Sequence, residues 1–90
     1  MIAVVILSGL PSNVTAANTL VQNSFERWAN PGFNTWFVVT GMTHVQLRDW
    51  IHASVPDVHV MVAKLAGECA WIGSAMDQTG AWIKDVKQFF

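Results

Sequence analysis

The chain has 90 residues, of which 52% are hydrophobic and only 12% are charged, and its formal net charge is −1. A chain of this length is expected to form a single domain over residues 1–90. The chain has five Lys and Arg and no basic run, which excludes strong non-specific binding of nucleic acid by a monomer. A dimer would double a weak patch of positive charge. The apolar excess, with five Trp and five Phe, favours a second subunit that covers part of the surface.

The single cysteine and the apolar opening segment indicate where in the cell the protein is expected. One cysteine cannot form an internal disulfide, which is typical of a reducing cytosol, so we expect a cytoplasmic protein. The opening residues MIAVVILSGL resemble the apolar part of a signal peptide but have no Lys or Arg ahead of them. They are also shorter than the ~20 residues that span a bilayer, so we expect a buried strand and no membrane contact.

The first predicted element is a strand over Ile2–Ser8, a β-branched run typical of a central strand covered on both faces. The residues GLPSN end it, and Ser12 or Asn13 is expected to cap the following helix. Apolar residues at three- and four-residue steps predict that this helix runs from Val14 to Trp28.

A second strand is predicted over Thr35–Thr40, and the short ANPGFN link before it leaves little room for another. Thr43 and Gln46 form a capping-box pattern, which predicts a helix that runs to about Ser54. A third strand is predicted over Val58–Ala63, where alternation turns His59 outward if the valines face the core. Ser74 and Asp77 then indicate the start of a final amphipathic helix that reaches Phe89.

The order β-α-β-α-β-α indicates an α/β (α+β) domain with helices packed on one sheet. One possible arrangement is a ferredoxin-like sheet with helices mainly on one face, where a short extra strand lies in PGFN or GECAW. The other is a small three-layer sandwich. We favour coverage of one face, because three helices can scarcely wrap both faces of a sheet in a chain of this size.

Three segments carry a resemblance to a known group of proteins. TWFVVTG (35–41), LRDWIHASVPD (47–57) and VHVMVAKLAGECAWIG (58–73) resemble the small proteins called SinR-type. These are similar to the VapD-like proteins and to the small CRISPR-associated endonuclease that forms the central dimer of the spacer-integration complex. The resemblance implies a ferredoxin-like fold, a homodimer paired through sheets and, for some relatives, metal-dependent cleavage of RNA or DNA.

The nucleases of this group resemble one another in an Asp at the end of the first strand, where this chain has Ser8. Mg²⁺ needs hard anionic oxygen, so we expect no catalytic residue and no cofactor here; Mg²⁺ enters only with the nuclease alternative. His44, His52 and His59 have spacings that match no local zinc pattern, so we expect no metal site.

The candidates for ligand or partner contact are Ser8, Lys64 and Glu68, and the last two otherwise read as a surface ion pair. Cys69 has apolar neighbours and is expected to be a small buried hydrophobe rather than a nucleophile. The interface candidates are tryptophans on faces predicted to be apolar: Trp36, Trp50, Trp71 and Trp82.

The favoured hypothesis for function is a non-catalytic homodimeric module that joins a larger nucleic-acid-processing or defence assembly through protein contacts. The alternatives are a metal-dependent nuclease of the same group and a small phage-type inhibitor protein that docks onto a larger machine. Direct contact with nucleic acid is expected to be weak, because positive charge is scarce.

Overall fold

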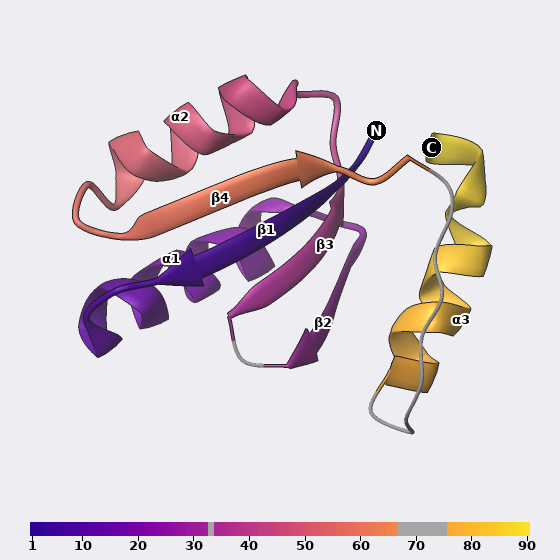
Figure 1. Ribbon diagram of the computed structural model, residues 1–90, viewed down its shortest axis with the longest axis horizontal. Coiled ribbons are helices and arrows are strands. Elements are labelled where there is room, and N and C mark those ends of the chain that lie inside the picture. The colour runs from indigo at the N-terminus through magenta and orange to yellow at the C-terminus, as the bar shows by residue number, and fades with distance from the viewer. Residues whose placement is uncertain (33, 67–75) are drawn as a thin grey trace.

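The computed structural model describes residues 1–32, 34–66 and 76–90, which form a small α+β domain (Figure 1). In this part of the chain, one antiparallel sheet of four strands is accompanied by three α-helices. The elements in chain order are β1 (Ile2–Ser8), α1 (Pro11–Ser24), β2 (Trp28–Gly32), β3 (Thr35–Val39), α2 (His44–Ser54), β4 (His59–Lys64), α3 (Asp77–Asp85) and a 3-10 helix (Lys87–Phe89).

The strand order in the sheet is β2-β3-β1-β4, and every neighbouring pair is antiparallel. β1 and β2 therefore run in the same direction with β3 between them, and α1 connects them. In the same way β3 and β4 run in one direction with β1 between them, and α2 connects them. The β-α-β pattern of the sequence thus forms two interleaved units rather than a sheet of adjacent parallel strands.

α1 and α2 both pack on one face of the sheet, and the main core lies between them and the strands. Alternate residues of β1 point to this face and are almost fully buried, as the two-residue period of a strand requires. The buried residues of this core are Ala3, Val5, Leu7, Val14, Ala17, Val21, Trp36, Val38, Leu47, Ile51 and Val58. The expectation that helices lie mainly on one face agrees with this core.

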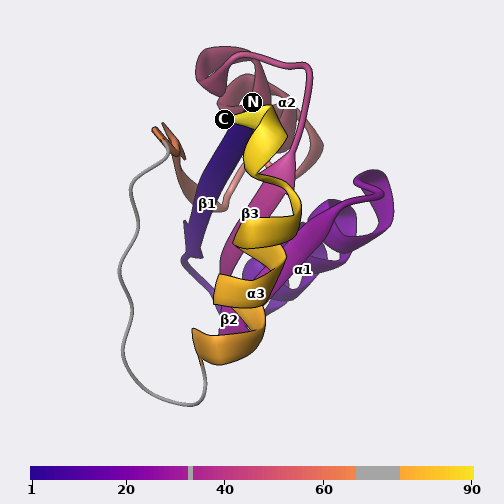
Figure 2. The ribbon, with the colours of Figure 1, turned by 90° about the vertical axis from the view of Figure 1, so that its right-hand side faces the viewer.

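α3 has a different position and packs against β2 (Figure 2). Its buried residues are Thr79, Gly80 and Ile83, and Val86 after it is buried as well. Ala29 of β2 is also nearly buried. A second, smaller region of packing therefore exists at the β2 edge of the sheet.

β2 is the main departure from the order β-α-β-α-β-α, although the ferredoxin-like alternative placed a short extra strand in PGFN, whose first two residues end β2. α1 ends at Ser24, so Trp28 does not lie in its last turn, as the apolar periodicity predicted, but begins a strand. Trp28 pairs with Val38, and the carbonyl of Arg27 accepts a hydrogen bond of 3.0 Å from the amide of Val39. Backbone pairing with a distant strand therefore decides the conformation here, against a local pattern that fits a helix.

The ANPGFN link contributes residues to this strand, so the expected lack of room was wrong. A register shift between Ala29 and Gly32 accommodates Pro31, which has no amide hydrogen to offer, in a strand at the edge of the sheet. The side-chain Oδ1 of Asn30 accepts a hydrogen bond of 2.9 Å from the amide of Gly32 and stabilises the irregular segment.

Most of the remaining boundaries follow the sequence closely, but α3 ends at Asp85, and a 3-10 helix rather than the predicted α-helix reaches Phe89. β1 spans the predicted residues, β3 ends one residue earlier than predicted, and β4 begins and ends one residue later than predicted. The capping box of α2 is confirmed: Thr43 Oγ1 accepts from the amide of Gln46 at 3.1 Å, and Gln46 Oε1 accepts from the amide of Thr43 at 3.0 Å. The predicted cap of α1 was wrong, because the helix begins at Pro11 with Leu10 as its N-cap.

The two ends of the chain lie near each other at one corner of the molecule, as both ribbon views show (Figures 1 and 2). The ammonium group of Met1 donates a hydrogen bond of 2.8 Å to the carbonyl of Thr40, which continues the pairing of β1 with β3 by one step.

Candidate functional site

The residues predicted to contact a ligand do not come together in the described structure. Ser8, the last residue of β1, pairs with His59, whereas Lys64, the last residue of β4, pairs with Ala3. Five steps along β1 separate the two positions, which is ~17 Å at about 3.4 Å per residue. Both side chains are exposed. Glu68, the third candidate, lies outside the described residues, as do Cys69 and Trp71.

Trp36 is not available to a partner, which corrects its prediction as an interface residue. It is 4% exposed and belongs to the core of this chain. Its indole Nε1 donates a hydrogen bond of 2.8 Å to Oδ1 of Asn18 in α1. This bond satisfies the polar atom that burial would otherwise leave without a partner.

Trp50 and Trp82 keep part of their surface exposed. The ring of Trp50 meets that of Phe25 edge to face, with centroids 5.8 Å apart, and so joins α2 to the end of α1. Trp82 of α3 lines a groove that is described below. These two tryptophans therefore lie on opposite sides of the sheet and do not belong to one surface.

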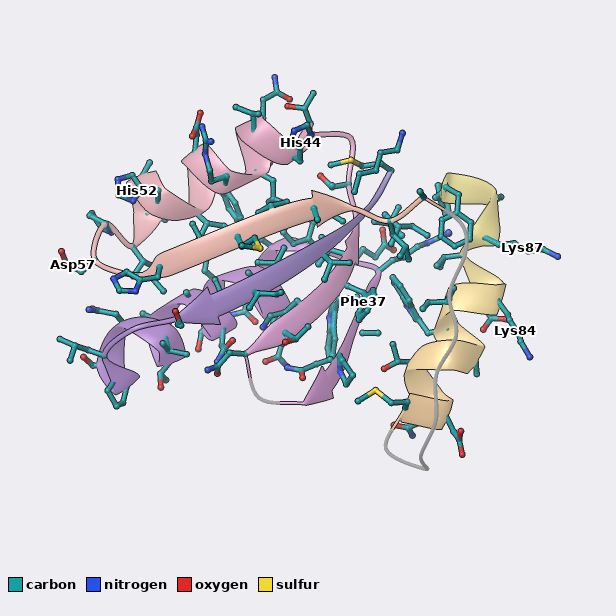
Figure 3. All side chains as sticks on the ribbon, viewed as in Figure 1. Phe37, His44, His52, Asp57, Lys84 and Lys87 are labelled. Atoms are coloured by element: carbon teal, nitrogen blue, oxygen red, sulfur yellow. The ribbon has the colours of Figure 1, made fainter. Side chains whose placement is uncertain are left out.

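The ionisable groups are dispersed in the described residues. His44 and His52 lie on α2 and Asp57 in the turn before β4, all at the outside of the molecule (Figure 3). Arg48 and Asp49 form an exposed ion pair of 2.8 Å, as expected for a solvated helix face. In the described part of the chain, no three His, Cys, Asp or Glu side chains lie close enough together to hold a metal ion.

A patch that we call the open face lies on the side of the sheet away from α1 and α2. It consists of Val4 and Ile6 from β1 and Met61 and Ala63 from β4. Ile6 pairs with Met61, so their side chains are direct neighbours, and they are 45% and 65% exposed. The expectation that β1 is covered on both faces was therefore wrong for its second half.

Exposure on this side of the sheet rises with distance from α3. Ala29 of β2 is nearly buried, Phe37 of β3 and Val4 of β1 are half-buried, and Met61 of β4 is exposed. The strand pairings place all of them on one face. Among the described strand residues, none that shares this face is Asp, Glu, Lys or Arg; Ser8, Thr35 and His59 are its polar members. The open face is thus an uncharged apolar surface with a polar margin.

A second feature is a cavity of about 230 Å³ between β2 and α3, which we call the tryptophan groove. Each side contributes a tryptophan to the lining, Trp28 from the strand and Trp82 from the helix. The remaining described residues that line it are small or neutral and polar: Ala29, Asn30, Gln78 and Thr79. The described lining therefore combines aromatic surface with hydrogen-bonding groups and carries no charge.

Both sides of the tryptophan groove are held by contacts outside it. The ring of Trp28 meets that of Trp36 edge to face, with centroids 5.2 Å apart. On the other side, the guanidinium carbon of Arg27 lies 4.9 Å above the ring centroid of Phe89, which ties the end of the chain after α3 to the start of β2. These contacts fix one wall to the core and the other to the sheet.

Neither feature was expected from the sequence. Local apolar runs indicate burial, but only the strand register shows that Ile6 and Met61 meet on the side that lacks α1 and α2. The one sequence signal for the open face was the alternation of His59, Met61 and Ala63 with valines. The tryptophan groove depends on β2, which periodicity assigned to a helix.

Comparison with known proteins leaves the fold and the site to be interpreted from the structure alone. No protein-family model, curated protein or solved structure matches the chain. None of the described helices is long and apolar enough to cross a membrane.

Proposed function

We propose that this chain is a non-catalytic interaction module that forms a homodimer through its open face and is built on a ferredoxin-like fold. The open face carries the proposal, because Ile6 and Met61 place adjoining apolar side chains in solvent without a charged neighbour on that face of the described strands. Exposed apolar patches with a polar rim mark interaction sites.

Two features support the ferredoxin-like assignment. The run β-α-β-β-α-β that precedes α3 is the order of elements typical of that fold. Read from the β4 edge, the sheet is β4-β1-β3-β2, with two interleaved β-α-β units and both crossover helices on one face. On this assignment α3 is an addition that covers the β2 end of the second face.

The charge of the open face favours a second copy of the chain as the partner. In a two-fold symmetric contact a patch meets itself, so a charged group near the axis would meet a like charge. The open face avoids this cost, since none of the described strand residues on that side is Asp, Glu, Lys or Arg. A standard interface takes about 800 Å² from each partner, so four side chains form only its centre, and we expect a weak dimer whose population depends on concentration.

The proposed biological setting is a nucleic-acid-processing or defence assembly that the dimer joins through protein contacts. This part of the proposal rests on the resemblance of TWFVVTG, LRDWIHASVPD and VHVMVAKLAGECAWIG to the SinR-type and CRISPR-associated proteins.

Sedimentation equilibrium between roughly 10 and 500 µM, the range for a weak dimer, tests the proposal. We expect a monomer–dimer equilibrium for the wild-type chain and at least a tenfold weaker dimer for Met61→Lys, because the new ammonium groups would be buried near each other. Val45→Lys is the matched control: Val45 is also an exposed apolar residue, but it lies on α2, away from the open face. A wild-type monomer at every concentration excludes the homodimer, and a dimer that Met61→Lys leaves unchanged excludes this face.

A further inference from the structure

We propose that the tryptophan groove binds one planar, uncharged heterocyclic ring of the nucleobase class. The ring stacks on the indole of Trp82 while its polar edge forms hydrogen bonds with the amide side chain of Gln78. This is a binding site on α3 and β2, separate from the open face, and it does not depend on the homodimer.

The size of the groove sets the size of the ligand. Sites for drug-sized ligands have volumes of roughly 300–1,000 Å³, and the groove, at about 230 Å³, is smaller. One or two fused rings fit this volume, whereas a whole dinucleotide exceeds it. The ligand is therefore a single ring system, either free as a nucleoside or presented by a strand.

The side chains of the groove determine the chemistry of that ring. Indole offers a flat polarisable surface on which every nucleobase can stack. A carboxamide has a donor and an acceptor side by side, which suits the paired polar atoms on the edge of adenine. The described lining carries no charge to recognise a phosphate, and Lys84 and Lys87 point away from the sheet (Figure 3). The recognised part of the ligand is therefore the base.

Residues that line the tryptophan groove are held in place by contacts within the chain itself. Trp28 is held against Trp36, and Oδ1 of Asn30 is oriented by its hydrogen bond to the amide of Gly32. Thr79, next to Gln78 in the first turn of α3, is almost buried. A site that needs little reordering loses less affinity on binding, which favours a small ligand with few contacts.

The test is a titration of the ¹⁵N-labelled protein with adenosine, followed through the indole N–H signals. We expect the signals of Trp82 and Trp28 to move and that of Trp50 to stay. Loss of base stacking in Trp82→Ala should weaken binding about tenfold or more, with partial recovery in Trp82→Phe. Gln78→Ala, an exposed position that leaves the fold intact, should weaken binding a few-fold through the lost hydrogen bond.

Trp50→Ala and Gln22→Ala are the matched controls, since they remove a half-buried tryptophan and an exposed glutamine elsewhere. Both should bind adenosine as the wild type does. A second titration with pentaadenylate separates the two sources of the base. Tighter binding than that of adenosine, with the same signal shifts, indicates a nucleic-acid strand, and weaker binding than that of adenosine indicates a free nucleoside.

Two results would overturn the proposal. One is a folded protein whose Trp82 and Trp28 signals do not move with adenosine up to about 10 mM, a concentration tenfold above a Kd of about 1 mM. The other is tighter binding of methyl glucoside than of adenosine, because a sugar lacks the planar ring on which the assignment depends.

Discussion

The indole Nε1 of Trp36 lies 2.8 Å from Oδ1 of Asn18, so a core tryptophan of β3 is hydrogen-bonded to the middle of α1. The side-chain nitrogen Nδ2 of Asn18 also donates a hydrogen bond of 3.3 Å to Oδ1 of Asn34. Trp36 in turn contacts Trp28 edge to face. A single polar side chain thus connects α1, the turn before β3 and one wall of the tryptophan groove.

Asn18→Ala is expected to lower the free energy of unfolding by about 1–3 kcal/mol, because it leaves the buried indole N–H of Trp36 without an acceptor. Urea unfolding followed by circular dichroism measures the change. Asn23→Ala is the control, since Asn23 is exposed on the same helix and should stay within about 0.5 kcal/mol of the wild type. Equal losses in the two variants would contradict the role given to this bond.

Gly9→Ala is expected to destabilise the chain by about 1–3 kcal/mol, because Gly9 has φ +129°, a backbone conformation that residues with a Cβ rarely adopt. Space is not the cause: an added Cβ would lie 3.6 Å from the carbonyl oxygen of Asp57, an ordinary contact. Thermal and urea unfolding both report the loss.

Gly41→Ala is the comparison for this substitution, since no positive φ and no neighbour within 4 Å opposes a methyl group there. A compatible Gly→Ala change restricts the unfolded chain, so we expect no loss, or a gain of up to about 1 kcal/mol. A destabilisation by Gly41→Ala as large as that by Gly9→Ala would refute the explanation from backbone conformation.

Arg27→Met is expected to weaken the attachment of the last residues to the sheet by about 0.5–1 kcal/mol, since it removes the charge above the Phe89 ring but keeps a long apolar stem. Amide hydrogen exchange of residues 87–89 should become faster while that of β1 is unchanged. Arg48→Met serves as the control, because the exposed pair with Asp49 contributes little. Unaltered exchange at 87–89 in Arg27→Met would show that the contact does not hold this segment.

Elements with a complete local signal were predictable. β1 is a β-branched run bounded by glycine, and the structure has it over the predicted residues. The N-terminus of α2 was specified by Thr43 and Gln46 alone, because both partners of its capping box lie within one turn. The outward position of His59 follows from strand alternation and is confirmed by its exposure.

Elements that depend on distant pairing were not predictable in this way. The residues WANPG of β2 have weak strand propensity and include a proline, and they form a strand because TWFVV of β3 supplies partners. The spacing of Phe25 and Trp28 fits a helix equally well, so periodicity extended α1 too far. Both candidate sites depend on this distant pairing, which explains why the predicted contact residues Ser8 and Lys64 lie at opposite ends of one ladder.

The closeness of the two chain ends has a practical consequence (Figures 1 and 2). A short peptide bridge can join Phe90 to Met1 and turn the polypeptide into a closed loop; the Met1 nitrogen then loses its charge but keeps one N–H for the carbonyl of Thr40. Backbone cyclisation reduces the freedom of the unfolded state and so raises the melting temperature. New chain ends can then be introduced at Gly41, an exposed position outside the strands and helices. The product is a circularly permuted chain with the same sheet.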